Sequence, residues 1–200
     1  MTTAPRMRTL TLHMTITVDG FIAKPDGTLW EAFPWPAEMQ EFNNHFFRQL
    51  DTAIYGRLNY QTIVPWWHDV AIGNPPADVP ITEQEIEFAN ILEGIGKVVF
   101  SRTMDAEATQ ARVLQGDVAR NVAELKSRTG GPIVLHGGAG LVAPLADAGL
   151  IDEYLLFVSP AAIGTGKPLF SGLARELPLS LLETRVFNSA FTLLRFQPAR

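Results

Sequence analysis

The chain has 200 residues, so we expect one domain over residues 1–200, with a disordered tail at residues 1–7. Because 46% of the residues are hydrophobic and 18% are charged, we exclude an intrinsically disordered protein. The net charge of −5 disfavours nucleic acid as a partner, and the absence of cysteine excludes disulfides, thiolate catalysis and cysteine-bound zinc. No apolar signal segment and no stretch of about 18 uncharged apolar residues occurs, which predicts a soluble, cytoplasmic protein without a membrane span.

Hydrophobic periodicity predicts alternating strands and helices in the first half of the chain. Residues 9–18 alternate apolar side chains with threonine, which is typical of a strand. Residues 36–50 place apolar side chains at spacings of three and four, which predicts an amphipathic helix. A short strand at 52–56 and one or two helical turns at 57–63 follow. Residues 64–80 are rich in proline, and we expect an inserted loop there.

The second half continues this alternation. Thr82 and Glu85 have the spacing of a capping box, which predicts a helix over 81–92. Beyond it we expect strands at 97–101, 112–116, 132–136 and 153–160. We expect helices at 117–128, with Asp117 as its N-cap, and at 140–149, and a C-terminal hairpin at 180–197 that turns at Asn188-Ser189. Strands that alternate with helices indicate a mainly parallel α/β sheet, to which the hairpin adds antiparallel strands.

Residues 133–140, IVLHGGAG, place three glycines between a predicted strand and a predicted helix. Glycine is costly in ordered structure, so such a cluster indicates a sharp turn or the close approach of a ligand to the backbone. The amino end of the following helix would attract a phosphate. A phosphate site is therefore one interpretation of this stretch, and a plain turn is the other.

Two familiar nucleotide-binding motifs fit the chain less well. Residues 162–170 contain Gly166-Lys167, but Pro168 stands where a P-loop has the serine or threonine that holds magnesium. Residues 138–143 match the glycine pattern of a Rossmann site, but the next predicted strand ends in Val158-Ser159-Pro160, without the acid that holds a ribose.

Arginine and hydroxyl side chains follow two further predicted strands. Arg57 follows the strand at 52–56. Ser101, Arg102 and Thr103 lie at the carboxyl end of the strand at 97–101. Because the carboxyl ends of parallel strands meet at one edge of a sheet, we expect these side chains near the glycine-rich turn. Arginine binds phosphate through two parallel hydrogen bonds. The sequence therefore predicts that a pyrophosphate approaches the glycines and that the arginines and Ser101 bind an additional phosphate, such as the 2′-phosphate of NADPH.

Five stretches resemble, in family order, the dihydrofolate-reductase-like superfamily and, within it, the reductase domain of riboflavin biosynthesis, namely residues 14–30, 54–63, 98–103, 133–142 and 152–170. The resemblance covers nearly the whole chain. It implies a three-layer α/β/α fold whose central, mostly parallel sheet of about eight strands is closed by a C-terminal antiparallel hairpin. It also implies an NADPH-dependent oxidoreductase that acts on a small heterocycle, with a homodimer as a candidate assembly.

The resemblance also implies roles for individual residues. The expected cofactor-binding residues are Thr15, Ile22 and Ala23 at the nicotinamide, Gly56, Arg57, Leu58, Asn59, Gly137, Gly138, Ala139 and Gly140 at the phosphates, and Ser101, Arg102 and Thr103 around the adenosine phosphate. Glu38 is the nearest match to the family's catalytic carboxylate, with Glu31 and Glu41 as rivals. His136 adjoins the glycine turn and is expected to contact the substrate. The histidines do not have metal-ligand spacing, so no metal is expected.

Three functions stay open at this point. The first is an NADPH-dependent reductase similar to 5-amino-6-(5-phosphoribosylamino)uracil reductase. The second is a dihydrofolate reductase, which is disfavoured because Val142 and Leu156 replace a tyrosine and a threonine of that enzyme. The third is a nucleotide-binding protein without turnover, which is kept open because basic residues for a substrate ribose phosphate are not found.

Overall fold

The computed structural model describes residues 7–28, 35–75, 79–107, 109–188 and 191–199. In these ranges the main sheet contains β1 (Leu10–Thr17), β3 (Thr52–Gly56), β4 (Gly96–Phe100), β5 (Arg112–Leu114), β6 (Ile133–His136), β7 (Glu153–Ser159), β9 (Leu179–Phe187) and β10 (Phe191–Pro198). A smaller sheet pairs β2 (Phe21–Ala23) with β8 (Lys167–Pro168). The helices are α1 (Ala37–Phe47), α2 (Arg57–Ala71), α3 (Glu83–Gly94), α4 (Val118–Ser127) and α5 (Ala139–Asp147).

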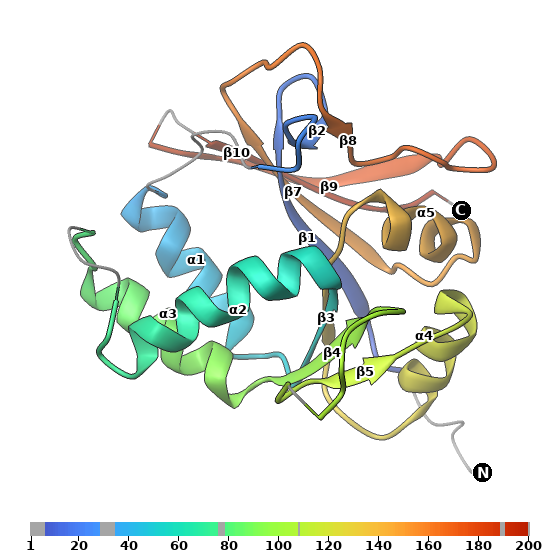
Figure 1. Ribbon diagram of the computed structural model, residues 1–200. Coiled ribbons are helices and arrows are strands. Elements are labelled where there is room, and N and C mark those ends of the chain that lie inside the picture. The colour runs from blue at the N-terminus through green and yellow to red at the C-terminus, as the bar shows by residue number, and fades with distance from the viewer. Residues whose placement is uncertain (1–6, 29–34, 76–78, 108, 189–190, 200) are drawn as a thin grey trace, which may run out of the picture.

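The main sheet has the spatial order β5-β4-β3-β6-β1-β7-β10-β9. Neighbouring strands from β5 to β7 are parallel, whereas β7, β10 and β9 pair antiparallel. Helices α1, α2 and α3 lie on one face and α4 and α5 on the other (Figure 1). The predicted mostly parallel α/β/α sheet, closed by a C-terminal antiparallel hairpin, is confirmed.

The alternation of β1 decides what each layer of the fold contacts. Leu10 and Leu12 are fully buried and pack in the cluster that contains the apolar side chains of α4 and α5. The intervening His13 faces the opposite layer, where its ring lies 5.7 Å from that of Phe46 and 5.2 Å from that of Phe47. Both faces of this central strand are therefore buried, as expected for a parallel sheet with helices on each side.

The predicted helix caps are confirmed. Thr82 accepts a hydrogen bond from the Glu85 N–H at 3.2 Å, and the Glu85 carboxylate accepts one from the Thr82 N–H at 2.8 Å. Asp117, expected as the cap of α4, accepts from the Arg120 N–H at 2.9 Å. These bonds satisfy donors that have no partner inside the helix, which is why local sequence was sufficient to locate both helix starts.

The prediction of a proline-rich loop at 64–80 is wrong for its first half, because α2 continues through Pro65. Trp67 packs edge-on against Phe88 of α3, with 4.8 Å between ring centroids, and Val70 is buried. A proline inside a helix removes one N–H hydrogen bond and crowds the preceding turn. Burial of this apolar face against α3 outweighs that cost, and it comes from tertiary contacts that local periodicity does not reveal.

Some predictions fall outside the described residues, namely those for residues 1–6 of the expected tail, residues 29–30, Glu31, residues 76–78 of the expected loop and Ser189 of the hairpin turn. The pairing of β2 with β8 was not predicted. Within the described part of the chain, no helix is long and apolar enough to cross a membrane.

Candidate active site

A cavity of about 1210 Å³ lies at the carboxyl ends of the parallel strands. Tyr55 of β3, Phe100 of β4 and His136 of β6 reach it from the sheet, and Arg57 and Ala139 reach it from the first turns of α2 and α5. A site for one small ligand typically occupies about 300–1,000 Å³, so this main cavity has room for a cofactor and a second small molecule.

The amino end of α5 forms one wall of the main cavity. Gly138, Ala139 and Gly140 line it, and the first N–H groups of a helix have no acceptor within the helix. A Cβ atom built on Gly137 would lie 2.9 Å from the Leu141 Cβ, whereas one built on Gly140 would meet nothing within 4 Å. Gly137 is therefore required by packing, and Gly140 leaves open space where a ligand can approach the backbone.

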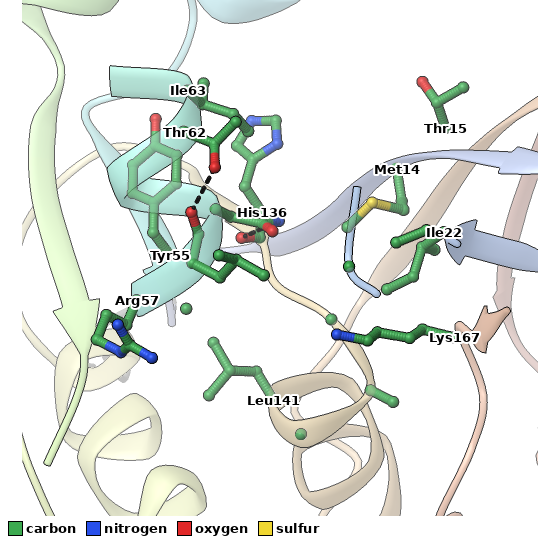
Figure 2. A pocket seen from close by; sticks show the side chains of 18 of the residues that line it. Met14, Thr15, Ile22, Tyr55, Arg57, Thr62, Ile63, His136, Leu141 and Lys167 are labelled. Carbon is green, nitrogen blue, oxygen red and sulfur yellow. Dashed lines mark hydrogen bonds between the residues drawn. The ribbon is translucent and has the colours of Figure 1, made fainter. Parts of the chain in front are cut away.

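Two cationic side chains flank this helix end. Figure 2 shows Arg57 and Lys167 on opposite sides of the cavity, with Leu141 of α5 between them. Arg57 donates to the Gln61 side-chain oxygen at 3.1 Å, and neither cation takes part in an ion pair within the described residues. Two unpaired cations beside a helix amino end make an anion-binding rim, a name we use below for Arg57, Lys167 and residues 138–140.

The β2–β8 sheet positions Lys167, which the sequence analysis missed. Ala23 lies opposite Lys167 in this pair, and a Cβ on Gly166 would lie 2.4 Å from the Ala23 carbonyl oxygen, so only glycine fits. This contact places Lys167 beside Ile22 and Ala23, which were predicted at the nicotinamide. The available signal was the Gly166-Lys167 pair, which lies in the stretch 152–170 that resembles the family.

The other end of the main cavity, which we call the inner end, is lined with rings, namely those of His13, Phe47, Tyr55, Trp67, Phe88 and His136. The His136 ring stacks on Tyr55 at 5.5 Å and 12°, and on Phe47 at 5.4 Å and 25°. The His13 ring lies 5.3 Å from that of His136. Stacked rings of this kind are suited to holding a flat aromatic ligand.

Both histidines of the inner end are neutral in the folded protein. Burial lowers the pKa of His13 to about 4, and burial together with the neighbouring His13 lowers the pKa of His136 well below its usual value. His13 Nε2 lies 3.0 Å from Asn43 Oδ1 of α1. The sequence analysis missed His13 as a site residue, although it interrupts the threonines on one side of its strand. No group of three or more metal-binding side chains occurs among the described residues.

Comparison with known proteins places the chain in a family. The family model of the RibD C-terminal domain matches residues 8–193. The chain belongs to this family. The chain is also similar to the uncharacterized protein YyaP of Bacillus subtilis (strain 168), with 32% identity over 190 residues that cover 94% of each chain.

Solved structures show the same fold. A candidate riboflavin biosynthesis protein of Shewanella sp. PV-4 superposes with a TM-score of 0.71 at 18% identity, over 96% of this chain and 99% of that one. The deaminase/5-amino-6-(5-phosphoribosylamino)uracil reductase of Thermotoga maritima superposes with a TM-score of 0.64 at 16% identity, over 96% of this chain and 57% of that one. Dihydrofolate reductase of Enterococcus faecalis, complexed with NADP(H), superposes with a TM-score of 0.61 at 14% identity, over 96% of this chain and 97% of that one. The RibD C-terminal domain therefore has the dihydrofolate-reductase-like fold, as predicted.

The RibD C-terminal domain brings most of the predicted site residues to one place. The main cavity is lined by Thr15, Ile22, Ala23, Gly56, Arg57, Leu58, Asn59, His136, Gly138, Ala139 and Gly140. Asn59 donates to the His136 carbonyl oxygen at 3.1 Å, which ties the first turn of α2 to the end of β6. Predicted residues from three separate stretches of the sequence, 15–23, 56–59 and 136–140, therefore meet in the folded protein.

The predicted adenosine-phosphate residues do not line the main cavity. Ser101 is buried, and its hydroxyl accepts from the N–H groups of Thr103 at 3.2 Å and Met104 at 3.0 Å. Thr103 borders a separate cavity of about 690 Å³, and Arg102 is exposed. Because Phe100 does line the main cavity, these residues begin just beyond its edge, and their phosphate role stays a prediction.

The structure does not place Glu38 at the main cavity. Its carboxylate pairs with Arg185 of β9 at 2.8 Å, and the Arg185 guanidinium lies 4.9 Å from the ring centre of Phe187. The rival Glu41 is exposed and does not line the cavity either. Glu38 occupies the helix face that turns toward the C-terminal hairpin, an orientation that only the packing of α1 decides.

The Glu38→Gln variant is therefore expected to behave like the parent protein. NADPH affinity and NADPH oxidation should stay unchanged from pH 5 to pH 8, and the free energy of unfolding should fall by at most about 1 kcal/mol, because the ion pair is partly exposed. Arg185→Gln removes the same pair from the other side and is the matched control. Selective loss of oxidation in Glu38→Gln, without loss of binding, would restore Glu38 as a proton donor.

The stability of the RibD C-terminal domain should fall in mild acid. Below a pH of about 6.5 each of these imidazoles binds a proton when the protein unfolds. Its contribution to the free energy of unfolding is therefore complete above the unfolded pKa of about 6.5 and is lost as the pH falls toward the folded pKa. With a folded pKa of about 4, His13 alone should lower the free energy of unfolding by about 2 kcal/mol between pH 7 and pH 5. Urea unfolding of His13→Gln should show a flatter pH dependence, whereas replacing the exposed His45 should leave it unchanged.

Proposed function

We propose that this RibD C-terminal domain is an NADPH-dependent reductase of a small, flat heterocycle. The main support for the proposal is that a single cavity contains both the anion-binding rim and the aromatic inner end. A dinucleotide has the phosphates that the rim is suited to bind, and a flat substrate suits the stacked rings. The proposal includes a homodimer as the assembly and the cytoplasm as the compartment.

The cofactor half of the proposal follows from the rim. The pyrophosphate would accept hydrogen bonds from the free N–H groups at the start of α5, and Arg57 and Lys167 would neutralise its charge from either side. Thr15 and Ile22, on the same cavity, would hold the nicotinamide. The likeness of fold to the NADP(H)-bound reductase of Enterococcus faecalis supports this arrangement.

Hydride transfer mainly requires the protein to position the cofactor and the substrate. When bound, NADPH supplies a hydride to an electrophilic carbon of the substrate. The chain holds donor and acceptor about 3–3.5 Å apart and excludes water from the inner end by its ring-lined wall. Among the described lining residues the one carboxylate is Asp26, whose Oδ1 accepts from the Thr28 N–H at 2.9 Å. We therefore assign the proton that completes the reduction to water.

A pyrimidine substrate is favoured over a folate. The Shewanella and Thermotoga proteins are described as a riboflavin biosynthesis protein and a 5-amino-6-(5-phosphoribosylamino)uracil reductase, and both have the fold of this chain. Folate reduction depends on a carboxylate beside the pterin, and no described carboxylate lies at the inner end. Leu156, at the position of the folate enzyme's threonine, is buried in the core.

Thermal unfolding with NADPH or NADH tests the cofactor half. A ligand at 100 times its dissociation constant should stabilise the protein by about 2.7 kcal/mol, and we expect this of NADPH at concentrations where NADH has little effect. Equal responses would contradict a 2′-phosphate site.

Oxidation of NADPH, followed by its absorbance, tests the catalytic half. The assay uses 5-amino-6-(5-phosphoribosylamino)uracil, its unphosphorylated form and dihydrofolate as acceptors. We expect oxidation with a pyrimidine. Oxidation with dihydrofolate alone would support the folate alternative, and NADPH binding without oxidation by any acceptor would support the nucleotide-binding alternative.

A further inference from the structure

We propose that the inner end of the main cavity binds an uncharged, unphosphorylated flat ring whose amide-like edge hydrogen bonds to His136. The inference rests on the proposed reductase function, and it goes further by naming the class of substrate. It separates this chain from a reductase that holds a phosphorylated pyrimidine.

Charge is divided between the two ends of the main cavity. The ionised side chains that line it in the described ranges are Asp26, Arg57 and Lys167, and Arg57 and Lys167 flank the amino end of α5 (Figure 2). Asp26 precedes Gly27, where a Cβ would lie 2.9 Å from Lys167 Nζ, so these two side chains share one side of the rim. A phosphate drawn into the inner end would lose its hydration without gaining a cation, which is strongly unfavourable.

The ring of His136 is placed to bind a ligand edge. Tyr55 and Phe47 stack on this ring, and its two nitrogens are its polar atoms. Within the described part of the chain, the hydrogen bond at this residue is made by its backbone oxygen, which accepts from Asn59, and not by the ring. The ring itself lines the cavity (Figure 2).

The neutral state of the His136 imidazole determines which ligand groups can form hydrogen bonds with it. The neutral ring offers one N–H donor and one bare nitrogen acceptor that point in diverging directions, so a lactam such as uracil can form one hydrogen bond with it, either through its C=O to the ring N–H or through its N–H to the bare nitrogen. The groups packed around the ring, namely His13, Phe47 and Tyr55, are uncharged at neutral pH, and burial raises the pKa of Tyr55 while it lowers those of both histidines. His13 has its Nε2 engaged by Asn43, which leaves His136 as the imidazole available to a ligand.

A direct test compares two ligands that differ by one phosphate. Isothermal titration calorimetry of the NADP⁺-saturated protein is performed with 5-amino-6-(ribosylamino)uracil and with its 5′-phosphate. We expect the unphosphorylated compound to bind at least tenfold more tightly. Equal binding, tighter binding of the phosphate, or no binding of either compound would each overturn the inference.

Variants of His136 test the recognition itself. His136→Phe keeps the stacked ring and removes both nitrogens, so binding of the unphosphorylated pyrimidine should weaken at least tenfold. His136→Gln keeps a donor and an acceptor and should recover part of the loss. His45→Phe, on the exposed face of α1, is the matched control and should bind as the parent does. Unchanged pyrimidine affinity in His136→Phe would overturn the assignment.

Titration with NADPH separates the two levels of the proposal. Variants that bind NADPH as the parent does are folded, so a change in pyrimidine affinity then reports the inner end alone. If His136→Phe does not fold, the parent's preference between the two ligands and the Gln variant decide the matter. Failure of the parent to bind NADPH would contradict the proposed function, whereas failure to distinguish the two pyrimidines would contradict only the substrate class.

Discussion

Replacing Gly140 by aspartate is expected to weaken NADPH binding at least about 100-fold while the protein stays folded. The backbone of Gly140 does not have a positive φ, and a Cβ there meets no atom within 4 Å, so the side chain fits. A carboxylate in the first turn of a helix is itself stabilising by about 0.3–1 kcal/mol. The same carboxylate would face the phosphates, and two like charges about 4 Å apart repel by about 4 kcal/mol near a protein surface.

Calorimetric titration with NADPH, combined with urea unfolding, checks this result. Gly140→Asn has nearly the same volume without the charge and should lose much less affinity, which separates repulsion from obstruction. Gly137→Ala should do the opposite, because its Cβ would collide with Leu141 and cost about 1–3 kcal/mol of stability. An aspartate variant that binds NADPH normally would mean that the phosphates do not approach α5.

Removing both rim cations is expected to reduce NADPH affinity about 100-fold, with Arg57→Ala and Lys167→Ala each contributing about tenfold. A hydrogen bond to a charged group contributes about 1.5–3 kcal/mol, so a loss of this size corresponds to one such contact per side chain. The two side chains lie on opposite sides of the cavity, so their effects should add. The double variant should also bind with a weaker dependence on salt.

Titrations at low and high ionic strength measure both effects. Arg120→Ala removes one exposed positive charge from α4, away from the main cavity, and is the control for net charge. Should Lys167→Ala match the parent while Arg57→Ala loses affinity, the rim would consist of Arg57 and α5 alone, and Lys167 would belong to the surface.

Local sequence was sufficient wherever neighbouring residues carry the interaction. The capping box of Thr82 and Glu85 closes within one turn, and the alternation in 9–18 follows from the geometry of a single strand. The order of strands and helices, together with the rule that parallel strands end at one edge, also predicts that Arg57, Gly140 and His136 lie close together, and all three line the main cavity.

Other features depended on contacts between distant segments. α2 continues through Pro65 because α3 covers its apolar face. Lys167 reaches the rim because β8 pairs with β2, about 140 residues earlier in the chain. Glu38 turns away from the cavity because Arg185 of the terminal hairpin lies beside α1. In each case the deciding partner is far along the chain, and periodicity within one segment has no information about it.

The sequence by itself determined the fold class, the helix caps and two of the segments that form the anion-binding rim, at Arg57 and at residues 138–140, because these follow from local hydrogen bonding and from the common direction of parallel strands. Only the tertiary structure decided which side chains enter the cavity. It added Lys167 and His13, turned Glu38 away from the cavity and stacked His136 with Tyr55 and Phe47, because side-chain direction and burial are set by packing between elements that the sequence separates.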